Sequence, residues 1–380
     1  MEQMPTPTAT ETPPTFVTVG TNAAIAFGLD AATRARRLAV KAGLDCGDAP
    51  AAGQAVLLAD LDFAWDPAWL ASIAKRSSKV LMLGERAVLA HVPAEMDAAP
   101  MIAAMASGSA WTGDGLERLD AATAQLTNHE LRKRERPFVL PLDAADPEPV
   151  ERAAYDASYK GVTDALTLFL WRGLAFHLTR WAARIGMTPN QITTIGAILC
   201  VATFFLFRHG DYWLGMAAGF GFMVLDTVDG KLARCTGQSS WWGNIFDHGI
   251  DLVHPPFWWW AWADGLAYWN DPFEPVYQVL IVSAIVAGYV AQRVIEGIFM
   301  RKYDMHIHVW RPIDSKFRLI TARRNPNMII LLVSLVFRRP DMGLELVALW
   351  TMISLIFHAV RLAQANARSE RGRKLTSWLA

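Results

Sequence analysis

The chain has 380 residues, of which 53% are hydrophobic, and its formal net charge is zero. This composition is too apolar for a protein that is soluble throughout, and the length allows two structural units. The three cysteines, Cys46, Cys200 and Cys235, have no metal-ligand spacing. They argue against a disulfide framework and favour a reducing, cytosol-facing environment.

The first part of the chain predicts a polar leader, an α/β domain and a linker. Residues 1–14 lack the basic and apolar segments of a signal peptide, and we expect a disordered leader. In residues 15–130, strand-like "TFVTVG", "AVLLADLDF" and "KVLMLGERAVLAHV" alternate with helix-like "LDAATRARRLAVKAG" and "DPAWLASIAKR". This alternation predicts a soluble α/β domain with a largely parallel sheet. The charged, Pro-rich residues 131–158 predict a linker.

Residues 159–186 have the pattern of an amphipathic helix. The segment "TDALTLFLWRGLAFHLTRWAARIG" carries apolar residues at helical spacing, with arginines between them. We expect this helix to lie on a membrane surface. The alternative is an ordinary helix that packs on the α/β domain.

Residues 187–366 predict a membrane domain of six transmembrane helices. The candidate spans, each near the ~20 residues that a bilayer requires, are roughly 190–208, 211–234, 241–267, 275–300, 326–338 and 343–363. The fifth is the weakest, because Arg338 and Arg339 end it early. Lys and Arg gather in the loop from Arg301 to Arg324 and in the tail, residues 367–380. We therefore expect a multi-pass protein of the inner or plasma membrane whose termini and acidic residues face the cytoplasm.

Four aspartates lie in this apolar region, where an ionised carboxylate costs several kcal/mol. Asp226 and Asp229 share one helical face, and Asp247 and Asp251 share a face of the next helix. Their mutual repulsion would be removed by a hard divalent cation, Mg²⁺ or Mn²⁺, with Ca²⁺ also compatible. Four carboxylates are enough for two ions.

The residues around the aspartates suit a phosphate-containing ligand. Gly230, Ala233 and Gly243 would allow a ligand to approach the backbone, and Arg234 could hold a phosphate by forked hydrogen bonds. The pattern predicts phosphoryl transfer at a membrane surface. Two alternatives remain: solvated aspartates at helix ends, or a cation transporter, whose acidic residues would be expected nearer the middle of the bilayer.

The spacing Asp226-x2-Asp229-Gly230-x2-Ala233-Arg234-x8-Gly243-x3-Asp247-x3-Asp251 resembles the signature of the CDP-alcohol phosphotransferase family. The resemblance covers about residues 155 to 365. It implies a homodimeric enzyme in which an acceptor hydroxyl displaces CMP from a CDP-linked alcohol.

The resemblance also implies the roles of individual residues. The metal ligands would be Asp226, Asp229, Asp247 and Asp251, and Asp251 would also be the general base. The nucleotide-binding residues would be Asn190, Asp229, Gly230, Ala233, Arg234 and Gly243, with Arg234 on the diphosphate.

Two further groups of residues have open alternatives. Asn190 in "MTPNQITTIG" would help to close the nucleotide pocket, or the segment simply begins a helix with Thr188 as its cap. Arg293, Arg323 and Arg324 would bind an anionic acceptor such as inositol phosphate, or they reflect topology and contacts with anionic lipids.

The α/β domain resembles the nucleotidyltransferase domain of two-part enzymes that make inositol-phosphate diesters. Asp60 or Asp62 would match a metal-binding aspartate at a strand end. However, the run "GTNAAIAFGLDAATRARR" lacks the Gly-rich loop that cradles a triphosphate. We therefore expect a degenerate domain that regulates, binds a ligand or packs on the membrane domain.

Taken together, the sequence predicts an integral-membrane, Mg²⁺-dependent CDP-alcohol phosphotransferase of phospholipid or polyol-phosphodiester biosynthesis. It would transfer a phospho-alcohol group from CDP-diacylglycerol or a CDP-polyol to an acceptor hydroxyl, with no nucleic-acid partner. The alternatives are a bifunctional cytidylyltransferase and phosphotransferase, a non-catalytic membrane scaffold, and a cation transporter.

Overall fold

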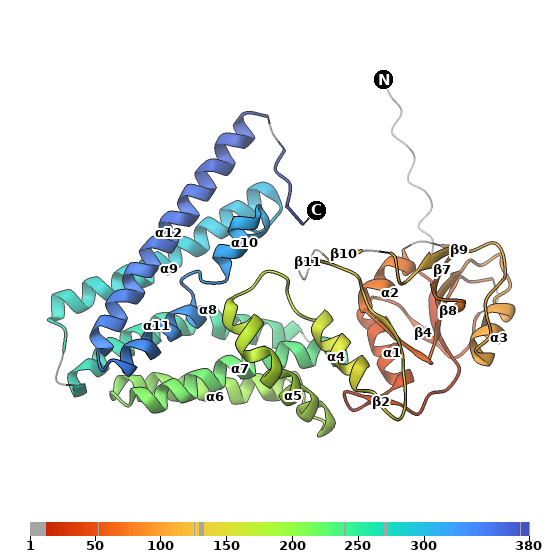
Figure 1. Ribbon diagram of the computed structural model, residues 1–380, viewed down its shortest axis with the longest axis horizontal. Helices are drawn as coiled ribbons and strands as arrows, with labels where there is room; N and C mark the ends of the chain where they lie inside the picture. Colours follow the sequence, from red (N-terminus) through yellow and green to blue (C-terminus); the bar gives the residue numbers. More distant parts are fainter. Residues whose placement is uncertain are drawn as a thin grey trace. The chain divides into compact units, whose positions relative to one another are not determined.

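The computed structural model describes residues 13–379 except 52, 76, 125, 129–132, 239–240, 270–271 and 373. The side chains of residues 126–128, 133–135, 242, 244, 247 and 248 also fall outside the description. The chain forms two compact units (Figure 1). The first contains Met1–Asn128, Glu135–Tyr159 and Cys235–Gln238, and the second His129–Arg134, Lys160–Arg234 and Ser239–Ala380. The predicted leader lies outside the described residues as far as residue 12.

The first unit is built on a six-stranded mixed sheet with the strand order β4-β1-β5-β8-β7-β9. Its strands are β1 (Thr15–Val19), β4 (Cys46–Gly47), β5 (Val56–Asp60), β7 (Lys79–Leu83), β8 (Arg86–Val92) and β9 (Glu117–Asp120). β1 runs parallel to β4 and β5, and β7 parallel to β9, whereas β8 is antiparallel to both neighbours. The sheet is therefore less parallel than predicted, because "KVLMLGERAVLAHV" turns at Gly84, whose φ is +60°, and forms a hairpin.

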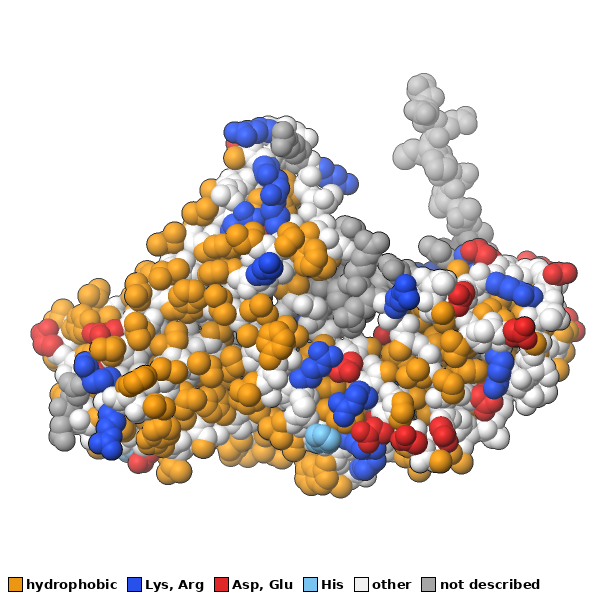
Figure 2. Space-filling view, in the orientation of Figure 1, with side chains coloured by type: hydrophobic (Ala, Val, Ile, Leu, Met, Phe, Trp, Pro, Cys, Tyr) orange, Lys and Arg blue, Asp and Glu red, His pale blue; other side chains and the backbone are white. Residues whose placement is uncertain are grey.

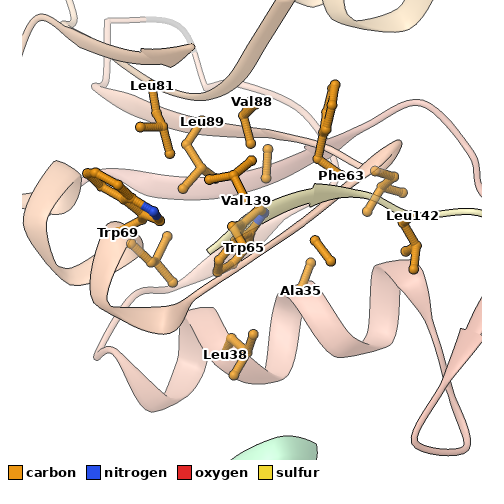
Figure 3. Close-up of a cluster of buried hydrophobic side chains, with 14 of the residues drawn as sticks. Ala35, Leu38, Phe63, Trp65, Trp69, Leu81, Val88, Leu89, Val139 and Leu142 are labelled. Carbon is orange, nitrogen blue, oxygen red and sulfur yellow. The ribbon is translucent and has the colours of Figure 1, made fainter. Parts of the chain in front are cut away.

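Helices cover both faces of this sheet. α1 (Ala31–Lys41) and α2 (Pro67–Ala74) share one hydrophobic core, and α3 (Ala99–Ser107) contributes to another. Successive strand residues point to opposite faces, so Phe16 enters the α1 and α2 core and Val17 the α3 core. Figure 3 shows the first core, which includes Trp65, Trp69 and Leu38 of α1.

Most of the predicted linker is part of the α/β unit. β12 (Val139–Pro141) pairs antiparallel with β6 (Phe63–Trp65). α4 (Glu148–Ala157) is tied in by Glu151, whose Oε1 accepts from Phe27 N at 2.9 Å. Residues 131–158 therefore add a strand and a helix with a buried face to the α/β unit. Their charge and proline content had predicted a linker instead. The other short strands are β2 (Ile25–Ala26), β3 (Leu29–Asp30), β10 (Leu126–Asn128) and β11 (Lys133–Glu135).

The second unit is helical. Its main helices are α6 (Pro189–Arg208), α7 (Tyr212–Thr236), α8 (Trp241–Gly265), α9 (Pro275–Tyr303), α11 (Arg324–Val336) and α12 (Pro340–Glu370), which coincide with the six predicted spans. Shorter elements are η1 (Leu166–Leu170), α5 (Trp171–Arg184), η2 (Leu266–Trp269), η3 (Ile307–Val309) and α10 (Pro312–Arg318). Thr188 caps α6 in a capping box with Gln191, and Pro189 occupies its first turn, which confirms the predicted helix start.

Within the described residues, three of these helices, α6, α9 and α12, are long and apolar enough to cross a membrane. α11 has 13 residues and is about 20 Å long, short of the ~30 Å hydrocarbon core. Figure 2 shows a broad hydrophobic surface over the helical unit, and exposed residues such as Ile198, Val279 and Ile356 contribute to such surfaces. A helical domain of membrane type follows from these features. Six spans, and the placement of α5 on a membrane surface, stay predictions.

Candidate active site

Two carboxylates and one guanidinium group meet where α7, α8 and α11 come together. Arg324 Nη2 donates to Asp226 Oδ2 at 2.6 Å, and Arg324 Nη1 donates to Asp251 Oδ1 at 2.5 Å. The Arg324 guanidinium carbon also lies 4.6 Å from the centroid of the Phe222 ring. The predicted convergence of the faces that carry Asp226 and Asp251 is therefore present, and a cationic group lies between them.

Asp229 lies on α7, one turn after Asp226, and is 4% exposed. Thr193 of α6 donates from Oγ1 to Asp229 Oδ2 at 2.6 Å. Because a hydrogen bond to a carboxylate holds its orientation, Thr193 fixes the direction in which Asp229 presents its oxygens.

Asp247 belongs to α8, between Gly243 and Asp251 in the helical backbone. Its side chain lies outside the described residues, so its predicted role as a metal ligand stays a prediction. Gly243 lies one turn before Asp247, as the sequence spacing requires.

The carboxylate oxygens suit a hard divalent cation. Asp226 and Asp251 already converge on one cationic group, and oxygen donors are the ligands that Mg²⁺ and Mn²⁺ prefer. For a metal to bind both of these carboxylates, Arg324 would have to leave the position between them.

Arg234 lies directly beside Gly230. A Cβ atom added at Gly230 would lie 3.0 Å from Arg234 Nη2, closer than an ordinary van der Waals contact. The absence of a side chain at Gly230 therefore leaves the space that the guanidinium group occupies. Ala233 is half-buried on the same helix, and Asn190 is exposed in the first turn of α6.

A cavity of about 990 Å³ runs between α6 and α8. Asn190 and Gly243, both predicted to contact the nucleotide, contribute to its lining. The rest of the lining is mainly apolar, including Val201, Phe205 and Phe257. The wall of this cavity therefore contains two residues predicted to contact the nucleotide, and the rest of the wall is mainly apolar.

A second cluster of charged side chains surrounds Glu296 of α9. Arg323 donates to Glu296 Oε1, and His308 Nε2 lies 3.4 Å from the same oxygen. Arg293 Nη1 lies 3.4 Å from the other oxygen, Oε2. Arg293 and Arg323 therefore contact the same carboxylate group, whereas Arg324 joins the aspartates, and the predicted role of all three in acceptor binding stays a prediction.

Arg318 and His358 complete this cluster. Arg318 interacts electrostatically with Glu296, and burial lowers the pKa of its guanidinium group. His358 is 1% exposed, its ring centroid is 5.4 Å from that of His308, and among the described residues neither of its ring nitrogens has a hydrogen-bond partner. Glu296, His308 and His358 each offer a ligand atom within 4.8 Å of the others, and they form a group that could hold a metal ion.

In the α/β unit, Asp60 and Asp62 share the guanidinium group of Arg86. Arg86 Nη2 donates to Asp60 Oδ2 at 2.9 Å and to Asp62 Oδ2 at 2.7 Å. Asp60 is 2% exposed, and burial raises the pKa of its carboxyl group while Arg86 opposes that shift. The position that a metal would take between the two predicted ligands is therefore occupied by an arginine.

Sequence reasoning missed several residues of these clusters. Thr193 is one turn after Asn190, which is the only signal that could have placed it near the nucleotide site. Glu296 is one turn after Arg293 and was detectable as its helical neighbour. His308 and His358 carry no local pattern, because only the fold brings η3 and α12 together.

Comparison with known proteins identifies the helical domain. Residues 186–357 match the family model for CDP-alcohol phosphatidyltransferase. This region is a CDP-alcohol phosphatidyltransferase domain, and the resemblance in the aspartate signature is thereby confirmed.

Similar proteins include cholinephosphotransferases and an archaetidylinositol phosphate synthase. Cholinephosphotransferase 1 of Danio rerio is 30% identical over 128 residues, which are 31% of this chain and 32% of that protein. Archaetidylinositol phosphate synthase of Pyrococcus horikoshii is 27% identical over 192 residues, 50% of this chain and 89% of that protein. The chain thus spans about a third of the length of the cholinephosphotransferases that it matches.

A solved structure, Mycobacterium tuberculosis phosphatidylinositol phosphate synthase with CDP-DAG bound, aligns with a TM-score of 0.37 at 20% identity. The alignment covers 50% of this chain and 94% of that chain.

Proposed function

We propose that this protein transfers a phospho-alcohol group from a CDP-alcohol to the hydroxyl of an acceptor and releases CMP. The observation that carries the proposal is the convergence of Asp226 and Asp251 from two helices on one cationic position, inside a CDP-alcohol phosphatidyltransferase domain. Asp229 lies one turn from Asp226 and is oriented by Thr193.

The reaction needs a base, a leaving group and charge neutralisation. The acceptor oxygen attacks the phosphorus that bears the alcohol, the bond from that phosphorus to the CMP oxygen breaks, and CMP leaves. Asp251 accepts the hydroxyl proton; its side chain is 44% exposed, compared with 18% for Asp226, so an acceptor can reach it. Arg234 would hold the diphosphate and balance the charge that develops on CMP.

Asp226, Asp229, Asp247 and Asp251 would hold one or two Mg²⁺ ions. When bound, the metal would supply positive charge to the phosphate oxygens. Two residues would support this site. Thr193 keeps Asp229 oriented, and Gly230, which has no side chain, leaves room for Arg234 beside the nucleotide.

The cavity between α6 and α8 supports a lipid-linked donor such as CDP-diacylglycerol. Its apolar lining would take one hydrocarbon chain, and Asn190 and Gly243, which line the same cavity, would contact the nucleotide. Val201→Trp should obstruct the cavity, since Val201 is 57% exposed within it. We expect this variant to lose turnover of CDP-diacylglycerol and to keep turnover of a soluble CDP-polyol. Equal loss with both donors would contradict a lipid-linked donor.

The cluster around Glu296 supports an acceptor that carries its own phosphate. Arg293, Arg318 and Arg323 bring three positive charges, whereas Glu296 and Asp164, which interacts electrostatically with Arg318, bring two negative charges. This excess of positive charge favours an anion over a metal ion at Glu296, His308 and His358. Arg293→Gln should raise KM for inositol phosphate and leave KM for the donor unchanged. Metal retained by the purified protein and lost in His358→Gln would support the metal instead.

The α/β unit would not transfer cytidylyl groups in this proposal. Arg86 holds Asp60 and Asp62, and no Gly-rich loop follows β1. A ligand-binding or regulatory role is retained for this unit. The cytoplasmic orientation, the dimer and the plasma-membrane location also remain part of the proposal.

CMP release by the purified protein with Mg²⁺ tests the reaction directly. CDP-diacylglycerol and CDP-inositol would each be offered with inositol phosphate, glycerol phosphate or free inositol. Asp251→Asn should lower the rate about 10²-fold or more, the range for loss of a general base. Asp264→Asn is the matched control, because Asp264 lies on the same helix and pairs with Arg208. Equal rates in the two variants would overturn the assignment of Asp251.

A further inference from the structure

A basic pocket lies beside the last turns of α12. Neither the aspartates nor the residues of the Glu296 cluster line it. The pocket has a volume of about 330 Å³. Its lining includes Trp310, Arg311, Arg361, Gln364, Arg368 and Arg371. The α12 residues 361, 364, 368 and 371 recur at three- and four-residue intervals, so one helical face supplies most of the wall.

Three arginines of this pocket lie around the ring of Trp310. It is 4% exposed, and the guanidinium carbons of Arg361, Arg311 and Arg368 lie 4.2, 5.3 and 5.9 Å from the centroid of its ring. Cation–π attraction to an indole holds guanidinium groups in place. Three positive groups are thereby gathered around one side chain.

Among the described residues, Arg361 is the one arginine of this pocket that pairs with a carboxylate. Arg361 donates from Nε to Asp314 Oδ1 at 2.5 Å and from Nη2 to Asp314 Oδ2 at 2.8 Å. Within the described part of the chain, no ion pair joins Arg311, Arg368 or Arg371 to a carboxylate. Three uncompensated arginines in one small pocket produce a site that attracts an anion with more than one oxygen.

The position of the pocket along α12 suggests which anion it meets. The large exposed hydrophobic residues of α12, among them Ile353, Ile356 and Val360, end at Val360, directly before Arg361. From Arg361 to Arg371 the helix rises about 15 Å. If α12 spans a membrane, the pocket therefore begins where the hydrocarbon ends and lies at the level of the lipid headgroups.

We propose that this pocket binds the phosphate-bearing headgroup of an anionic phospholipid. The headgroup phosphate would lie against Arg311 and Arg368 over Trp310, and its acyl chains would continue along the apolar surface of α12. Arg361 acts as a positioning residue, because its pairing with Asp314 of α10 ties α12 to the segment that carries Arg311. A free phosphate compound has the same binding chemistry but gains nothing from the apolar surface.

The test measures binding by the full-length protein in detergent, with native mass spectrometry as the readout. The probes are phosphatidylglycerol, phosphatidylcholine and inorganic phosphate. The variants are Arg368→Gln, Arg371→Gln and the double variant Arg311→Gln with Arg368→Gln. Arg301→Gln is the matched control, because Arg301 is exposed and does not line the pocket. Size-exclusion profiles show whether each variant remains folded.

We expect phosphatidylglycerol to bind more tightly than phosphatidylcholine. Its affinity should fall about fivefold for each arginine removed from the pocket. Arg301→Gln should bind phosphatidylglycerol as the unchanged protein does. Equal weakening in the control would overturn the proposal, because the attraction would then belong to the surface as a whole. Inorganic phosphate that competes with phosphatidylglycerol at equal concentration would also overturn it, and would assign the pocket to a soluble anion.

Discussion

Arg323 and Arg324 are neighbours at the start of α11, yet their guanidinium groups contact carboxylates in two different clusters. Arg323 contacts Glu296 of α9, whereas Arg324 joins Asp226 of α7 to Asp251 of α8. The first turn of α11 therefore links the proposed acceptor site to the proposed metal site.

Arg324→Gln should lower the thermal stability of the metal-free protein and increase the stabilisation that Mg²⁺ gives. Without its charge, the aspartates repel one another in the metal-free protein, so Tm in a chelator should fall. Mg²⁺ should then raise Tm more in Arg324→Gln than in the unchanged protein, because the metal no longer has to displace a cation. Arg323→Gln is the matched control and should keep the original Mg²⁺ response. An identical Mg²⁺ response in Arg324→Gln would show that Asp226 and Asp251 bind no metal.

Thr193→Val should weaken the metal site through Asp229. The substitution removes the hydroxyl that donates to Asp229 Oδ2 and keeps the side-chain shape. Loss of such an outer contact typically costs about 10- to 100-fold in metal affinity or activity. The measurement is the Mg²⁺ concentration that gives half-maximal CMP release. Thr203→Val is the control, because Thr203 lies on the same helix and its Oγ1 donates to the backbone oxygen of Leu199; a similar shift in both variants would refute the role of Thr193.

Gly230→Ala should impair donor binding. The new Cβ would lie 3.0 Å from Arg234 Nη2, so Arg234 would have to shift by a few tenths of an ångström. We expect KM for the CDP-alcohol to rise about tenfold, with a smaller change in kcat, because Arg234 is assigned to the diphosphate. Gly297→Ala provides the comparison, since a Cβ there meets nothing within 4 Å. An unchanged KM in Gly230→Ala would show that Arg234 does not bind the diphosphate of the donor.

Arg86→Gln should destabilise the α/β unit in a pH-dependent way. The change leaves Asp60 buried without its cation, at a cost of about 2 kcal/mol near neutral pH. Burial already raises the Asp60 pKa above its ordinary value of 3.8. The protonated carboxyl therefore favours the folded state, and its contribution is present at low pH and lost as pH rises through the raised pKa.

Thermal unfolding of Arg86→Gln between pH 4 and pH 8 provides the measurement for this prediction. The deficit relative to the unchanged protein should shrink towards pH 4. Arg118→Gln, an exposed arginine of β9, serves as the comparison. A deficit that is constant with pH would mean that Asp60 does not depend on Arg86.

The sequence alone determined the helical segments and the candidate acidic site. The six apolar helices are set by local composition, and the three- and four-residue spacing places each pair of aspartates on one helical face. The same local reasoning placed the Thr188 cap of α6 correctly. It failed for residues 131–158, since proline and charge gave no sign that β12 would pair with β6.

The tertiary structure decided which side chains contact the aspartates. Arg324 lies 98 residues from Asp226, and Thr193 lies 36 residues from Asp229. Glu296, His308 and His358 come from three separate elements, and Trp310 meets Arg361 and Arg368 only because α12 packs beside η3. Periodicity reports which face of one helix a residue occupies. Contacts between helices depend on how whole faces pack together, and no local pattern in the chain records that packing.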